Sequence, residues 1–425
     1  MSVVQPADLE KDARDDASPS PVQPSPVSTI PNGGVIAWLQ VAGAFTLFLN
    51  SWGIVNTFGA YQTYYKSSFL ANESDSNISW IGSIQAFLLL IIGVVTGPIY
   101  DAGYFNVLVA VGSFLVVFGM FMTSICKTYW ELMLAQGLCV GLGSGCLFIP
   151  SVAIVSTYFT TKKSFATGIA ASGSSVGGVI YPIIFAQLQP KIGFGWATRV
   201  IAFIMLGTLL IPLTVMRVRV KPAQTRRLFE LAAFKEVPFT MFSVGEFFGF
   251  MGLYIPFFYI QSYVINKNIM SSHLGFYMLS ILNAASLFGR VIPNFLADKT
   301  GPFNMLVPCS LISAILAFVW IGIKNTGGII VFCILYGFFS GTFVSLPPTT
   351  VVSLSPNMGV VGTRMGMSFS FAGFGLLVGN PVAGAILKSG SWVGVQAFCG
   401  AAVAIATVTM AIARLSKSAT LMSKV

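Results

Sequence analysis

The sequence predicts an all-α membrane protein in which twelve transmembrane helices form two six-helix bundles. Of the 425 residues, 55% are apolar and only 8% are charged, whereas a soluble domain carries about 25% charged residues. The apolar residues also gather in runs of about 20, the length of a spanning helix, without the alternation typical of outer-membrane barrels. One histidine beside 37 phenylalanines argues against a metalloenzyme or a histidine-based hydrolase.

The chain opens with a polar segment, residues 1–31, that holds five acidic and two basic side chains. This composition cannot bury a core, so we expect a disordered cytoplasmic tail, and it lacks the apolar stretch of a signal peptide. A basic linker, 217–237, divides the apolar runs into bundles at 32–216 and 238–414, and a short C-tail follows at 415–425. The predicted spans are 35–60, 79–99, 104–125, 131–156, 165–188 and 197–216, and then 239–264, 274–297, 303–323, 327–352, 361–387 and 391–413.

Lysine and arginine in the loops predict the orientation of the spans, because cytoplasmic loops carry an excess of these residues. Loops on the side of the N-terminus hold 13 of them, and the opposite loops hold six. We therefore expect both termini in the cytoplasm and place the protein in the plasma membrane. The sequons at Asn72 and Asn77 fall in the first outer loop, which predicts glycosylation there.

The two halves repeat each other at an offset of about 195 residues. Gly-x-Tyr segments end at Tyr61 and Tyr254, and the second and eighth spans end at Asp101 and Asp298. Such a repeat indicates parallel bundles with a substrate site between them near the midplane, the architecture of an alternating-access carrier.

Six motifs carry a family resemblance over about 390 residues. They are Gly33-Gly34 with Ala37-Trp38-Leu39-Gln40, Asn50-Ser51-Trp52-Gly53-Ile54-Val55-Asn56, Gln62-Thr63-Tyr64-Tyr65, Gly195-Trp196-Ala197-Thr198-Arg199, Pro256-Phe257-Phe258-Tyr259 and Phe288-Gly289-Arg290. The chain resembles the major facilitator superfamily, and more narrowly the fungal branch of its monocarboxylate-porter-like family. The resemblance implies the major facilitator fold and a gating role for Asp101 and Asp298.

The departures from that family concern charged residues. Asn32 replaces the acid of the opening motif, and Asp101 is followed by Ala102 instead of a base. Animal monocarboxylate carriers have a binding lysine where this chain has Gly59, and an aspartate where it has Ser286. Proton–lactate symport is therefore not implied by the resemblance.

Two charged residues fall inside predicted spans, where an ionisable side chain is unfavourable and indicates function. Arg290 belongs to a helical stripe with Asn283, Ser286 and Asn294. We interpret it as a cation that attracts an anionic substrate; the alternative is a structural arginine that binds backbone carbonyls. Glu246 lies at a similar depth, and we hypothesise that it pairs with Arg290 and couples transport to protons.

Other polar side chains outline a pathway, although each is more often a packing residue than a ligand. The candidates are Asn50, Thr57, Tyr61, Tyr254 and Tyr336. Arg199 and Arg364 lie near span ends and are interpreted as interfacial anchors.

These features predict a secondary active transporter of a small organic anion or weakly acidic metabolite, not an enzyme. No nucleotide-binding motif occurs, so we expect a gradient of substrate or of an ion such as the proton to drive transport. We expect no metal, no cofactor and no nucleic acid partner, only a small-molecule substrate, the lipid bilayer and a functional monomer. We favour export of a fungal secondary metabolite; import of a monocarboxylate or a riboflavin-like vitamin, or a non-transporting sensor, are the alternatives.

Overall fold

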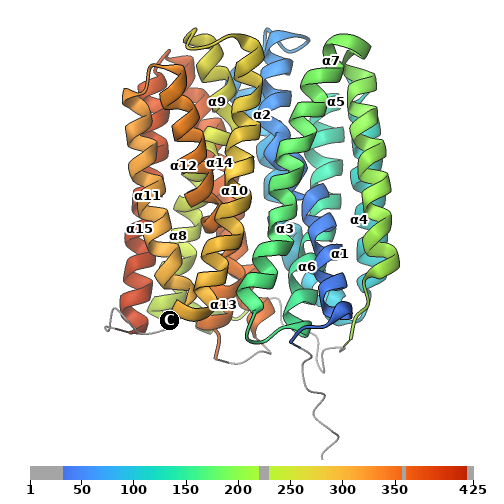
Figure 1. Ribbon diagram of the computed structural model, residues 1–425, viewed down its shortest axis with the longest axis vertical. Helices are drawn as coiled ribbons and strands as arrows, with labels where there is room; N and C mark the ends of the chain where they lie inside the picture. The colour runs from blue at the N-terminus through green and yellow to red at the C-terminus, as the bar shows by residue number, and fades with distance from the viewer. Residues whose placement is uncertain (1–31, 220–228, 357–359, 419–425) are drawn as a thin grey trace, which may run out of the picture. The chain divides into compact units, whose positions relative to one another are not determined.

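The computed structural model describes residues 32–219, 229–356 and 360–418, and every regular element within these ranges is a helix (Figure 1). The predicted tail at 1–31, the linker residues Lys221, Arg226 and Arg227, and most of the C-tail lie outside the described residues.

Eleven helical stretches of the described chain are long and apolar enough to cross a bilayer. The longest, α7 (Lys163–Val215), has 53 residues, and its backbone turns at Gly193 with φ 78° and ψ 168°. Glycine adopts this positive φ without the steric clash that a side chain would cause. The chain therefore reverses direction within α7 (Figure 1), and counting its two arms separately gives the twelve predicted spans.

The first six spans are built from seven α-helices and one π-helical segment. They are α1 (Val35–Asn50) with α2 (Trp52–Ser67), α3 (Asp75–Asp101), α4 (Phe105–Thr123), α5 (Tyr129–Leu132) with η1 (Met133–Val140) and α6 (Gly141–Tyr158), and the two arms of α7. The π-helical segment η1 contacts α3 and α4, and Gly137 there lies against the α3 backbone.

The last six spans follow a short 3-10 turn, η2 (Leu231–Lys235). They are α8 (Val237–Leu253) with α9 (Ile255–Asn266), α10 (Ser272–Thr300), α11 (Pro302–Val319) with η3 (Trp320–Gly322), α12 (Thr326–Ser345) with α13 (Pro347–Leu354), α14 (Val361–Lys388) and α15 (Trp392–Lys417).

Three spans are interrupted near their middle or end. The first breaks at Ser51, between α1 and α2; the seventh breaks at Tyr254, just before Pro256; and the tenth breaks at Leu346, just before Pro347. Proline removes a backbone donor and clashes with the preceding turn, which explains the last two breaks. Trp52 and Tyr254 thus stand at breaks in corresponding spans of the two halves.

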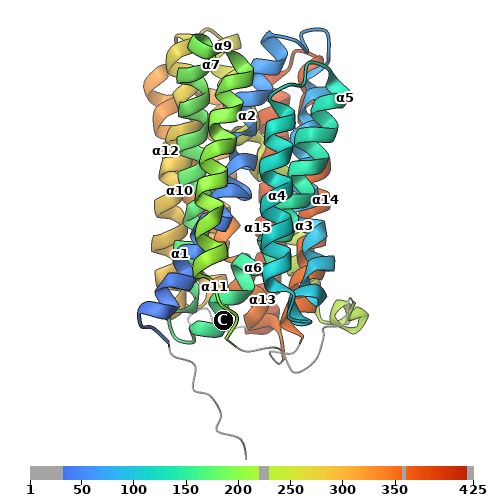
Figure 2. The ribbon, with the colours of Figure 1, turned by 90° about the vertical axis from the view of Figure 1, so that its right-hand side faces the viewer.

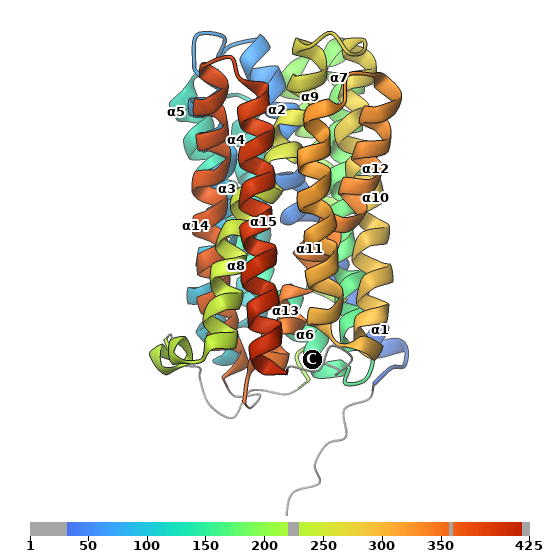
Figure 3. The same cartoon turned by 90° about the vertical axis from the view of Figure 1, so that its left-hand side faces the viewer.

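Helix α1 begins and α15 ends at the same end of the helical bundle, which we call the terminal end (Figures 2 and 3). At the opposite, far end the two halves are joined by direct contacts. The Thr63 and Ser262 hydroxyls are 3.1 Å apart, and the Ser76 hydroxyl donates to the Pro381 carbonyl at 2.9 Å. We refer to these contacts as the far-end seal.

We expect Gly384→Ala to weaken the far-end seal. A Cβ at residue 384 would lie 2.7 Å from the backbone N and Cα of Ser76, and overpacking of this kind costs about 1–3 kcal/mol. A Ser262→Cys reporter should then react about tenfold faster with a membrane-impermeant maleimide, since 1.4 kcal/mol is about tenfold in population. The control is Gly207→Ala, because a Cβ there meets no atom within 4 Å. Equal labelling rates in the two variants would contradict this account of the seal.

Candidate functional site

Aromatic rings from both halves surround a narrow cavity in the middle of the protein. The Trp52 ring stacks on that of Tyr254, with centroids 5.8 Å apart and planes at 29°, and Phe148 meets Trp52 at 6.0 Å and Phe369 at 5.4 Å. Phe250 stacks on Tyr254 at 6.0 Å. We call this narrow space, which in the present state has room for about one water molecule, the central cavity; Phe48, Thr167, Ala171, Ser345 and Pro348 also line it.

Arg290 of α10 is fully buried, and it lies behind the cavity lining, where it contacts the lining residue Ala171. Its Nε donates to the Ser286 hydroxyl at 3.2 Å, and its Nη1 donates to the Ala171 carbonyl of α7 at 3.4 Å. Its Nη2 has no hydrogen-bond partner. The Tyr254 hydroxyl is close enough to interact electrostatically with the guanidinium, although without a hydrogen bond of regular geometry. A buried cation with an unused donor is costly, and a bound anion would relieve that cost.

The Arg290 stripe lies between α7 of the first half and α12 of its own half. The Asn294 amide donates to the Arg290 carbonyl at 2.7 Å and to the Ser345 hydroxyl at 2.6 Å. Ser286 accepts a hydrogen bond from Ser175 of α7 at 3.3 Å. Asn283 donates to the Leu279 carbonyl, and its side-chain oxygen lies against Gly178 of α7. The stripe therefore packs between α7 and α12 and fixes the position of Arg290.

Glu246 of α8 is also fully buried, but the hypothesised ion pair with Arg290 is not formed. The ion pairs of the described residues do not include Glu246, and neither of its carboxylate oxygens has a hydrogen-bond partner. Its neighbour Gly245 packs against Thr409 and Met410 of α15. The helix turn that carries Glu246 thus contacts α15 and not α10. The similar predicted depth of Glu246 and Arg290 did not imply that the two side chains meet.

Four of the predicted pathway residues lie in packed regions instead of the central cavity. Asn50 donates to Thr208 at 2.9 Å and accepts from Tyr181 at 2.8 Å, and Thr57 donates to the Gly53 carbonyl. Tyr61 packs against Phe185, with ring centroids 4.5 Å apart, and Tyr336 donates to the Leu253 carbonyl at 2.9 Å. Of the predicted tyrosines, Tyr254 alone takes part in the aromatic wall described above.

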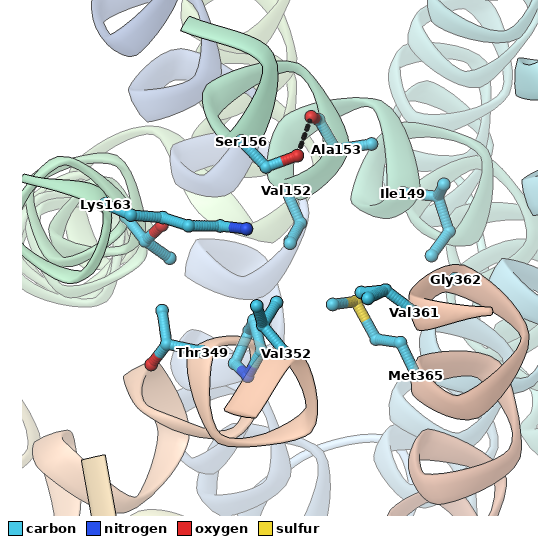
Figure 4. A pocket seen from close by; sticks show the side chains of 12 residues that line it. Ile149, Val152, Ala153, Ser156, Lys163, Thr349, Val352, Val361, Gly362 and Met365 are labelled. Atoms are coloured by element: carbon cyan, nitrogen blue, oxygen red, sulfur yellow. Dashed lines mark hydrogen bonds between the residues drawn. The ribbon is translucent and has the colours of Figure 1, made fainter. Parts of the chain in front are cut away.

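A second, wider pocket lies at the terminal end, between α6, α7, α13 and α14 (Figure 4). It holds about 570 Å³ of space between the atoms, part of it open to the outside. Thr167 and Pro348 line both this pocket and the central cavity. We call it the terminal pocket; it adjoins the central cavity at these two shared residues.

The two aspartates of the predicted gating motif are placed at the terminal end. The Asp298 carboxylate accepts hydrogen bonds from the Ser164 and Phe165 amides, each at 2.9 Å, and so joins α10 to the start of α7. Asp101 is buried at the end of α3. At the far end, the sequon residues Asn72 and Asn77 are exposed, and the Asn77 amide donates to Glu73.

Arg364 was interpreted as an interfacial anchor, and this was wrong, because only 1% of its side chain is exposed. Its guanidinium binds Glu230 at 3.0 Å and Glu236 at 2.6 Å, and also donates to the Leu354 carbonyl at 2.9 Å. These hydrogen bonds hold the described end of the linker against the start of α14. They also hold the pKa of the Glu236 carboxyl below its usual value. Arg199 donates to the Ser124 hydroxyl beside the Trp196 ring.

Sequence reasoning missed the aromatic wall and the acids that bind Arg364. Phe148, Phe250 and Phe369 are three of 37 phenylalanines, and no spacing separates them from the others. Within the described ranges, no cluster of three or more His, Cys, Asp or Glu side chains is arranged as metal ligands.

Comparison with known proteins identifies the family. Residues 43–362 match the sequence model of the Major Facilitator Superfamily. The chain belongs to this superfamily. The MFS-type transporter dbaD of Emericella nidulans is 49% identical over 372 residues, which cover 87% of this chain and 84% of the relative. The aspyridones efflux protein apdF of the same organism is 37% identical over 395 residues, 92% of this chain and 80% of the relative.

A solved structure of the nucleoside transporter NupG, in a mutant form, supports the fold. It superposes with a TM-score of 0.64 at 16% identity and covers 89% of this chain and 99% of its own. The major facilitator chain described here is thus a multi-pass membrane transporter of small molecules and not an enzyme, as the sequence predicted.

We expect Glu236→Gln to lower the melting temperature of this transporter at neutral pH but not in acid. A carboxyl whose pKa is lowered by folding stabilises the folded state above its unfolded pKa, about 4.3, and loses that contribution as the pH falls through the folded pKa. The effect should be small because 45% of the Glu236 side chain is exposed. Thermal unfolding in detergent between neutral pH and pH of about 3 measures the difference from wild type. Lys235→Gln, an exposed neighbour, is the control, and a difference that persists in acid would contradict the assignment.

Proposed function

We propose that this transporter exports a flat, partly aromatic, weakly acidic metabolite from the cytoplasm by alternating access. The observation that carries the proposal is the fully buried Arg290 guanidinium, with one unused donor, beside a cavity walled by aromatic rings of both halves. An anionic group would satisfy that donor, and the rings of Trp52, Tyr254 and Phe148 would stack on a flat body.

The direction of transport rests on two supports. The far-end seal closes one side, while the terminal pocket leads from the other side to the central cavity. We place the terminal end in the cytoplasm from the lysine and arginine count of the loops, so this state would accept a cytoplasmic substrate. Because an importer also visits such a state, the choice of export rests on the relative named as an aspyridones efflux protein.

Import of a monocarboxylate or a riboflavin-like vitamin is the second candidate. Arg290 suits any carboxylate, but a wall that includes Trp52, Phe148, Phe250 and Phe369 offers a small aliphatic acid few polar contacts. A larger aromatic substrate therefore agrees better with the cavity. We further propose a plasma-membrane monomer that carries glycans at Asn72 and Asn77.

Deletion of the gene should make one acidic metabolite accumulate in the cells and disappear from the medium. Complementation with Arg290→Gln should restore export at least about tenfold less well than the wild-type gene, because loss of a charge-assisted hydrogen bond costs about 1.5–3 kcal/mol. Complementation with Arg290→Lys should restore export in part. Metabolite profiling of cells and medium measures both effects. Arg199→Gln, which removes an arginine away from the cavity, is the control. A compound left unconsumed in the medium on deletion would support import instead.

Glu246 is proposed as the proton-coupling group, independently of Arg290. Glu246→Gln keeps the size of the side chain but can no longer exchange a proton, so export of the metabolite should lose its dependence on an imposed pH gradient. Counterflow, the exchange of the metabolite across the membrane without an imposed pH gradient, should remain. Transport in vesicles at several pH differences provides the measurement, and Glu131→Gln, an exposed carboxylate, is the control. An unchanged response to the gradient would rule out this role.

A further inference from the structure

The terminal pocket contains a charge that the proposed function does not use. Lys163, the first residue of α7, lines the pocket, and its amino group points into the pocket toward Val152 (Figure 4). Within the described ranges, Lys163 has neither a hydrogen bond nor an ion pair. The lining residues include no aspartate or glutamate. The Asp298 carboxylate accepts hydrogen bonds from the Ser164 and Phe165 amides, which follow Lys163 in the chain, and is not part of the lining.

The remaining lining of the pocket is mostly apolar and comes from both halves. Ile149 and Val152 belong to α6, whereas Val352, Val361 and Met365 belong to α13 and α14. A lysine whose only role was to set the orientation of the spans would extend its amino group into water. Here the amino group instead faces apolar side chains across an open space. This combination suits an organic anion with a flat apolar body better than a hydrated inorganic ion.

One face of α7 connects this pocket to Arg290. Lys163, Thr167 and Ala171 recur every four residues and so share a face. Lys163 lines the terminal pocket, Thr167 lines both spaces, and the Ala171 carbonyl accepts a hydrogen bond from Arg290. Lys163 and Ala171, the α7 residue that Arg290 contacts, are therefore separated along the helix axis by eight residues, roughly 12 Å at 1.5 Å per residue. An anion moving inwards would meet Lys163 first and Arg290 second.

We propose that Lys163 and the terminal pocket form a separate loading site, which binds the carboxylate or phenolate of an aromatic anion before it reaches the central cavity. This inference deepens the proposed function and rests on it for the direction of movement. The site is a binding site in its own right, however, and holds a ligand whether or not transport follows.

The test measures how fast a cysteine in the pocket lining reacts with charged reagents. It uses the full-length protein in lipid nanodiscs with the substitution Ser156→Cys as the reporter. Ser156 lines the pocket, and cysteine is close to serine in size. Its reaction rate is compared between an anionic reagent, sulfonatoethyl methanethiosulfonate, and a cationic one, trimethylammonioethyl methanethiosulfonate. Lys163→Gln should lower the anion-to-cation rate ratio by about tenfold, the effect of one nearby charge in a partly screened site. The protein without Ser156→Cys gives the background of the native cysteines.

Ligand binding is then read as protection of Ser156→Cys, with naphthoate as the anionic probe and naphthamide as its uncharged counterpart. Naphthoate should slow the modification, naphthamide should not, and Lys163→Gln should abolish the protection while Lys163→Arg retains it. Lys162→Gln, an exposed neighbour with the same change of charge, should behave as wild type. Thr157→Cys, which is on the same helix but not in the pocket lining, should not be protected.

An unchanged rate ratio in Lys163→Gln, no protection by naphthoate, or equal protection by both probes would each overturn the loading site. Arg290→Gln must leave the protection intact, because loss of protection there would mean that the anion binds only in the central cavity. Failure of the proposed function appears elsewhere, as undiminished export by Arg290→Gln in cells. The two inferences therefore fail in separate measurements.

Discussion

The structure depends above all on a buried cation held at the boundary between two helical halves. Arg290 belongs to the second half, yet one of its hydrogen bonds goes to the Ala171 carbonyl of the first half. Because this bond and the one to Ser286 leave Nη2 unused, the guanidinium is held in place but incompletely satisfied. In the proposed function, a cation in this state would hold the halves together and leave a place for a negative charge, and one residue would then link substrate binding to the relation between the bundles.

The backbone breaks explain how aromatic side chains of the two halves come together at the central cavity. Ser51 and Tyr254 interrupt the first and seventh spans at corresponding places. The rings beside these breaks, Trp52 and Tyr254, stack across the boundary between the halves. A straight helix would continue its i→i−4 hydrogen bonds through this point, whereas a break lets the two parts of a span tilt separately. The two helix breaks therefore affect both the hydrogen bonding within the spans and the shape of the cavity.

The two ends of the protein are held together by different kinds of contact. At the far end, Gly384 lies directly against Ser76, and hydroxyls bridge the halves, so the contact is short-range and sensitive to added volume. At the terminal end, Asp298 binds the first amides of α7, and Arg364 binds two acids of the linker. Charged hydrogen bonds near water exchange readily for hydration, which agrees with the proposal that this end opens and closes during alternating access.

The sequence by itself determined the number and approximate limits of the spans, the family, and the position of Arg290 and Glu246 within spans, because these follow from run length, motifs and charge. Only the tertiary structure decided which polar residues meet. Arg290 reaches Ala171 while Glu246 does not reach Arg290, and Arg364 binds acids 134 and 128 residues away. In a membrane helix the lipid-facing and packed faces are both apolar, so periodicity cannot distinguish them. The rotation of each helix, and with it the choice of Trp52, Phe148 and Phe250 as the cavity wall, is set by packing between helices distant in sequence.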